Sequence, residues 1–200
     1  METFLLALGL SVGYLVVVVA LEFLKRKRKV SSEITRRLIH IFSGLYTLLD
    51  YFLLPSAWFI GLITLSLIVM VISQRFGWFS AIHDVKRRTY GEIFLPIGTL
   101  LTYAISQGRA EIFIPSIFIM TFADSFAGLT SDLLKKERKV FQGSIVFFVI
   151  AFLLLVENTH LPLGHIWLAA LVVTLVERFS PLGTDNATVP VATALLLLTL

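Results

Sequence analysis

The 200-residue chain is 57% hydrophobic and 15% charged, which is too apolar for an ordinary soluble domain. It contains no cysteine, so disulfides and thiolate metal sites are excluded. A formal charge of +4 would fit a nucleic-acid partner, but in membrane proteins it more often reflects basic cytoplasmic loops. We therefore expect an all-α, polytopic integral membrane protein that binds no nucleic acid.

Eight apolar segments, each near the length of a membrane span, are predicted along the chain. They cover residues 3–24, 33–54, 56–73, 90–106, 111–130, 143–156, 165–179 and about 188–200. The first has its basic residues after it rather than before it, the reverse of a signal peptide, so we expect it to be retained. Two segments are short for a hydrocarbon core of about 30 Å. The prediction is therefore seven to eight transmembrane helices in one bundle, a single domain over residues 1–200.

The basic residues predict the orientation. If the N-terminus lies outside, sixteen of the seventeen Lys and Arg residues fall in cytoplasmic connections, and Arg109 alone faces outward. The opposite orientation reverses this count and violates the positive-inside rule. We expect both ends outside the cell membrane and the polar motifs at its cytoplasmic face.

The most informative stretch runs from residue 120 to residue 148. Asp124 interrupts an apolar run, where a carboxylate costs about 2.5 to 3.5 kcal/mol and usually faces the protein interior. Small residues follow at helical spacing, and then a basic loop with Lys136 and Lys139 leads to Gly143 and Ser144. A carboxylate beside a cationic loop suits a metal-bound polyphosphate at the membrane surface. The alternative is a buried Asp paired with a Lys for structural reasons.

Other unusual polar residues fall on the same predicted side. Arg36, His40 and Gly44 share one helix face, although positive-inside bias and helix packing would also explain them. Glu92 lies at a helix N-terminus, where the helix dipole favours an acid whatever its role.

A last acidic group flanks the final cytoplasmic loop. Glu177 precedes the loop, and Asp185 and Asn186 lie within it beside a proline and a glycine, a composition that turns also use. Asp185 re-enters the bundle at the level of Asp124, and this position favours a shared site.

Together these motifs resemble the family of dolichol kinases and phytol kinases, which includes the CTP-dependent diacylglycerol kinase of fungi. The matching motifs are Arg36-Arg37-Leu38-Ile39-His40 with Gly44, Tyr90-Gly91-Glu92 with Pro96, Asp124-x-x-Ala127-Gly128, Lys139-x-x-x-Gly143-Ser144, and Glu177 with Asp185-Asn186-x-x-x-Pro190. The central motif is also similar to that of phosphatidate cytidylyltransferases. Those enzymes carry Gly-Arg and Gly-Lys where this chain has Ser131-Asp132 and Lys135-Lys136, and Gln142 replaces the usual acid before Gly-Ser. No P-loop motif is present.

The resemblance implies transfer of the γ-phosphate of CTP to a lipid alcohol, with polyprenol or dolichol expected first and phytol, geranylgeraniol or diacylglycerol as alternatives. Asp124 and Asp185 are expected to hold Mg²⁺, and His40 or a carboxylate to position or deprotonate the hydroxyl. Glu92, Glu177 and Asn186 complete the expected site. The residues expected to bind the nucleotide are Arg36, Arg37, Gly128, Lys136, Lys139, Gly143 and Ser144.

Two other functions remain open. A phosphatidate cytidylyltransferase would release pyrophosphate and form a CDP-lipid. A small ion-coupled transporter would use Asp124 and Asp185 to line an ion path, but this leaves the clustering of all motifs on one side unexplained.

The charge count predicts that the loop from Lys135 to Lys139 faces the cytoplasm. The chain has no cysteine of its own, so a single cysteine introduced at Glu137 reports the side cleanly. We expect a membrane-impermeant thiol reagent to label it only after the cytoplasmic side is opened. Labelling from outside alone would overturn the predicted orientation.

Overall fold

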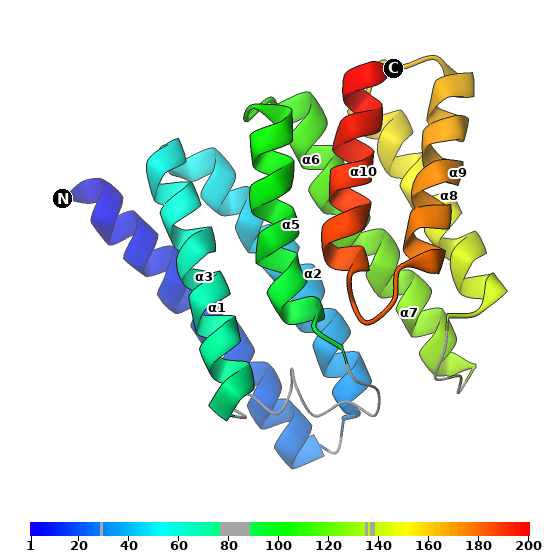
Figure 1. Cartoon of the computed structure of the whole chain (residues 1–200). Helices are drawn as coiled ribbons and strands as arrows, with labels where there is room; N and C mark the ends of the chain where they lie inside the picture. Colours follow the sequence, from blue (N-terminus) through cyan, green and yellow to red (C-terminus); the bar gives the residue numbers. More distant parts are fainter. Residues whose placement is uncertain (29, 77–88, 135, 137–138) are drawn as a thin grey trace. The chain divides into compact units, whose positions relative to one another are not determined.

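The computed structural model describes residues 1–28, 30–76, 89–134, 136 and 139–200 (Figure 1). Most of the connection between the predicted segments 56–73 and 90–106, which contains His83 and Asp84, and most of the basic loop after residue 134 lie outside the described residues. Every regular element in the described part is a helix, as the sequence predicted. The chain divides into two compact units, Met1–Lys86 and Arg87–Leu200.

The first unit consists of α1 (Glu2–Arg28), α2 (Ser32–Leu53) and α3 (Ser56–Phe76). The predicted start of α2 is confirmed, because the Ser31 hydroxyl caps the helix by accepting the Ile34 N–H at 3.3 Å. Helix α1 continues four residues beyond the predicted end at residue 24. Lys and Arg are good helix formers, and Arg26 pairs with Glu22 one turn earlier at 2.9 Å.

The second unit contains α5 (Gly91–Ser106), α6 (Ala110–Phe118), η1 (Ile119–Ala123), α7 (Asp124–Leu133), α8 (Phe141–Asn158), α9 (Leu163–Phe179) and α10 (Asp185–Thr199). Because α6, η1 and α7 follow without a break, they form one long helix, Ala110–Leu133, much of it buried. Helix α10 packs against α5, α6 and α9, and α8 packs against α7 and α9 (Figure 1). The core of this unit therefore lies around α6, η1 and α10.

Helix α8 has one exposed apolar face and one face buried in the protein. The side chains of Ile145, Val149, Leu153 and Val156 are exposed along one face, and the opposite face is buried against the unit. Only Gln142 and Glu157, at the two ends of α8, add exposed polar side chains, and an apolar exposed face between them is expected where hydrocarbon takes the place of water. Among the described helices, α1, α3, the α6–α7 helix and α8 are long and apolar enough to cross a membrane, whereas α5 and α10 are apolar but shorter. The architecture is that of an all-α membrane protein.

The π-helical turn η1 lies directly before Asp124. Such turns are rare, occur mostly as single insertions within α-helices and are frequent at functional sites. Its side chains Ile119, Met120, Thr121 and Ala123 are all buried. The turn therefore carries the buried helix into α7 and sets the direction in which Asp124 points.

Helices α5 and α10 approach each other unusually closely. A Cβ atom at Gly98 would lie 2.7 Å from the Cα atom of Ala187 and would also clash with the carbonyl oxygen of Asn186. These are backbone atoms and cannot move aside as a flexible side chain would. Only glycine permits this contact, which fixes the first turn of α10 against α5.

We predict that Gly98→Ala destabilises the protein by about 1 to 3 kcal/mol, because the added methyl group must push the two backbones apart. Gly164→Ala, in α9, is the matched control, since nothing lies within 4 Å of a Cβ atom there. Thermal unfolding of both variants in detergent checks this. An unchanged midpoint for Gly98→Ala would show that the close approach is unimportant.

Candidate active site

Three acidic side chains meet inside the second unit. Asp124 is the first residue of α7, Glu177 lies in the last turn of α9, and Asp185 is the first residue of α10. All three are buried, and each offers a carboxylate oxygen within 4.8 Å of the other two. Three motifs distant in the sequence therefore converge at one point, and Asp124 and Asp185 lie together as expected.

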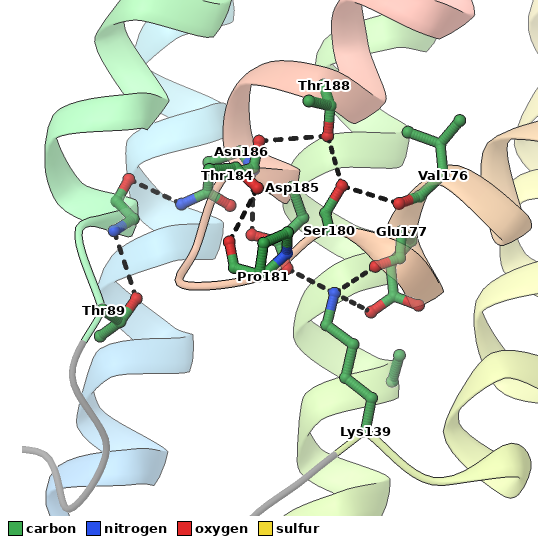
Figure 2. Close-up of polar contacts among 12 residues, drawn as sticks. Thr89, Lys139, Val176, Glu177, Ser180, Pro181, Thr184, Asp185, Asn186 and Thr188 are labelled. Carbon is green, nitrogen blue, oxygen red and sulfur yellow. Dashed lines mark hydrogen bonds and ion pairs between the residues drawn. The ribbon is translucent and has the colours of Figure 1, made fainter.

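The ammonium group of Lys139 lies among these acids (Figure 2). Its Nζ atom is 2.7 Å from Oε1 of Glu177 and 2.7 Å from Oδ2 of Asp185, and it also donates to the backbone carbonyl of Glu177. Burial alone lowers the pKa of the Lys139 ammonium, but the charges of the three carboxylates outweigh it and raise that pKa above its ordinary value. Lys139 therefore stays protonated and offsets part of the buried negative charge.

The donor set suits a divalent cation. Three carboxylates carry three negative charges when ionised, and one ammonium leaves two of these without compensation in the group. Mg²⁺ prefers oxygen ligands and is usually held by one or two carboxylates together with phosphate oxygens and waters. Asp124, Glu177 and Asp185 therefore fit a magnesium site, and Glu177 joins the two residues that the sequence assigned to the metal.

Asp185 is held in place by its neighbours. The sequence placed Asp185 and Asn186 in a loop, and this was wrong: α10 begins at Asp185. A helix N-terminus favours a carboxylate there, and the backbone N–H of Asn186 donates to Oδ1 of Asp185 at 3.1 Å. Its other oxygen, Oδ2, accepts from Lys139. Both oxygens of Asp185 thus have defined partners.

Asn186 joins the last motif to the second one. Its side-chain Nδ2 donates to the backbone carbonyl of Gly91 at 2.7 Å (Figure 2). The loop before α10 reaches the same place, because the Tyr90 N–H donates to the Leu182 carbonyl at 2.9 Å. Gly183 adopts a positive φ of 84°, and a Cβ atom there would lie 2.6 Å from the backbone nitrogen of Gly91. Asn186 is therefore a positioning residue that ties the start of α10 to the start of α5.

The motif with Gly143 and Ser144 lies in the first turn of α8, which begins two residues earlier than predicted, at Phe141. A Cβ atom at Gly143 would lie 2.9 Å from the Ala127 carbonyl oxygen, so glycine lets α8 approach α7. The Ser144 N–H donates to the Val140 carbonyl at 3.2 Å, so this backbone group is used within the start of α8.

Arg178 makes a contact in this region that the sequence did not predict. Its Nη1 atom donates to the Ser144 hydroxyl at 3.0 Å, although the sequence assigned it only to the positive-inside pattern. Arg178 directly follows Glu177 of the last motif, and this position was the signal that could have placed it near the site.

The other predicted residues are placed as follows. Lys136 is exposed, and its backbone N–H donates to the Ser131 carbonyl at 3.0 Å. Gly128 in α7 and Glu92 in the first turn of α5 are partly buried. Arg36, Arg37 and His40 belong to α2 in the first unit, where Arg37 and His40 are buried. The contribution of these residues to a site stays a prediction.

Comparison with known proteins gives one informative relative. No protein-family model matches the chain, and no solved structure matches it. A curated protein from Synechocystis sp., named phytol kinase, is 29% identical over 210 residues, covering 96% of this chain and 90% of the relative. The similarity therefore spans all the motifs from residue 36 to residue 190, and it confirms the resemblance to the dolichol and phytol kinase family.

Proposed function

We propose that this protein is a membrane-embedded lipid-alcohol kinase that transfers the γ-phosphate of CTP to the hydroxyl group of an isoprenoid alcohol. The observation that carries the proposal is the convergence of Asp124, Glu177 and Asp185 around Lys139. Phosphoryl transfer depends chiefly on charge neutralisation and in-line positioning, and a cation held by these carboxylates would supply the first. Similarity to a phytol kinase along nearly the whole chain supports the same reaction class.

The three carboxylates would hold Mg²⁺, which supplies positive charge to the phosphate oxygens of the nucleotide. Asp124 lies at the end of the π-helical turn, and Asp185 is fixed by the Asn186 N–H and by Lys139. Catalytic groups held by surrounding structure need no reorganisation during the reaction, which favours electrostatic catalysis. The preference for CTP over ATP rests on the family resemblance.

The polyphosphate would lie near the first turn of α8. The first N–H groups of a helix have no partner within it, and its positive dipole end favours an anion. Gly143, Ser144 and Gly128 border this region from α8 and α7, and Lys136 and Lys139 come from the loop between the two helices. Arg36 and Arg37 stay in the proposal as nucleotide ligands on the strength of the family motif alone.

The acceptor would present its hydroxyl at the membrane surface while its chain stays in the bilayer. His40 or one of the carboxylates would position or deprotonate that hydroxyl. The sequence favoured polyprenol or dolichol, and the phytol kinase relative moves phytol to the front of the candidates. All of these are isoprenoid alcohols, so one apolar site for the chain serves each of them.

The proposed arrangement in the membrane has seven to eight spans, with the N-terminus outside and the carboxylate site at the cytoplasmic face. This requires helices besides α1, α3, the α6–α7 helix and α8 to cross or enter the bilayer. Helix α10 has 15 residues and reaches only about 22 Å, less than the hydrocarbon core of about 30 Å. Asp185 at its start would then lie below the level of the lipid head groups.

We predict that membranes containing the protein transfer label from γ-labelled CTP to a lipid alcohol, whereas α-labelled CTP leaves the lipid unlabelled. A panel of phytol, geranylgeraniol, polyprenol, dolichol and diacylglycerol identifies the acceptor. Lipid labelled from α-labelled CTP would identify a cytidylyltransferase instead. Ion flux without nucleotide turnover would indicate a transporter.

Asp124→Asn should lower lipid phosphorylation at least about a hundredfold, because the variant keeps the size of the side chain but loses the charge that holds the cation. Asp132→Asn is the matched control in the same helix, since Asp132 is not one of the three converging carboxylates. Activity is measured against Mg²⁺ concentration in purified variants with parent-like unfolding midpoints. Activity of Asp124→Asn within about threefold of the parent would remove it from the site.

A further inference from the structure

All three donors of the Lys139 ammonium are used within the protein. A lysine ammonium has three N–H donors, and the structure gives it three acceptors: Oε1 and the backbone carbonyl of Glu177, and Oδ2 of Asp185. The side chain is only 21% exposed. Lys139 can therefore bind a phosphate only if it gives up at least one of these bonds.

The acceptors of Lys139 are also the expected ligands of a cation. Oε1 of Glu177 and Oδ2 of Asp185 belong to the group whose oxygens lie within 4.8 Å of one another. A divalent ion that coordinates these oxygens comes close to the ammonium, because both bind the same two atoms and each oxygen offers only two lone pairs. Two positive charges bound to the same carboxylate oxygens also repel each other strongly where the surroundings exclude water.

We propose that Lys139 is a displaceable counter-ion: a divalent cation and the Lys139 ammonium compete for the oxygens of Glu177 and Asp185, and the released ammonium becomes a ligand of the nucleotide phosphates. The second half of this statement rests on the proposed kinase function, and the first half does not. A positively charged partner stays beside the carboxylates throughout the exchange, since the ammonium leaves only as the cation arrives.

The position of Lys139 in the chain suits this exchange. It precedes Val140, the N-cap residue of α8, so a released side chain starts beside the helix end at which the polyphosphate is proposed to lie. Arg178 from α9 already reaches the first turn of the same helix through Ser144. Cation binding would thereby add one phosphate ligand, and the cation and the nucleotide would each strengthen binding of the other.

The first test measures cation binding without nucleotide or lipid. Lys139→Gln removes the competitor, so the variant should bind Mn²⁺ at least about tenfold more tightly than the parent. Its unfolding midpoint without Mn²⁺ should be lower, because three buried carboxylates lose their counter-ion, and Mn²⁺ should raise that midpoint more than in the parent. Lys136→Gln is the matched control: it removes the same charge from the same loop, where the side chain is exposed.

Equal or weaker Mn²⁺ binding by Lys139→Gln than by the parent would overturn the proposal. A second measurement on the unmodified protein covers the case in which this variant does not fold. An amine-acetylating reagent is applied with and without Mn²⁺, and the modification of each lysine is quantified by mass spectrometry. Acetylation of Lys139 should rise several-fold with Mn²⁺, while that of Lys136, the internal reference, stays constant.

The outcomes separate this inference from the proposed function. Exchange of Lys139 by Mn²⁺ in a protein that phosphorylates no lipid alcohol would support the counter-ion role and reject the kinase. Phosphorylation without any change at Lys139 on addition of Mn²⁺ would support the kinase and reject the exchange.

Discussion

Burying three carboxylates next to one another is the demand that the second unit of this protein has to meet. Like charges within 4.8 Å repel, and each charge loses the hydration it had in the unfolded chain. Lys139 offsets part of this cost through two ion pairs, and removing one partner from a buried pair typically costs about 3 to 5 kcal/mol. Such a cluster adds little to stability, so its presence inside this unit points to a function that uses the charge.

The same demand explains why backbone contacts are so close around Asp185. A carboxylate at the start of a helix is only as well placed as the helix itself. Here α10 is fixed by the absence of a side chain at Gly98 and by the hydrogen bond from Asn186 to Gly91. Neither residue is among the converging acids. Both act on Asp185 by holding α10 against α5. A small displacement of a catalytic group lowers the rate of a reaction that depends on orientation.

Much of the fold follows from the sequence because hydrophobic runs of span length, caps and prolines are local signals. Both ends of α2 lie within one residue of the predicted segment 33–54, with the Ser31 hydroxyl as its cap and Pro55 directly after its C-cap residue. The boundaries that were missed depend on context. Asp185 begins a helix although it stands in a composition that turns also favour. Helix α8 starts at Phe141, two residues before its predicted start.

The site was predictable only in part. Asp124 was found because a carboxylate in an apolar run is expensive wherever the chain folds. The family motif placed Glu177 in the expected site, but no local signal marked it as a metal ligand, because its position beside Asp124 and Asp185 comes from the fold. The partners of Lys139 lie 38 and 46 residues further along the chain, and no local pattern links them. The π-helical turn likewise has no signature in its five residues.

The π-helical turn also bears on how the length of this protein can change in evolution. A wide turn holds one residue more than the α-helical turn that would span the same rise, so losing one residue from Ile119–Ala123 would leave a regular helix with Asp124 still facing the acids. One residue lost elsewhere in the helix before Asp124 would instead rotate the carboxylate by about 100°. The extra residue of the π-helical turn thus lies immediately before Asp124, the residue whose side-chain direction determines whether it reaches the other two acids.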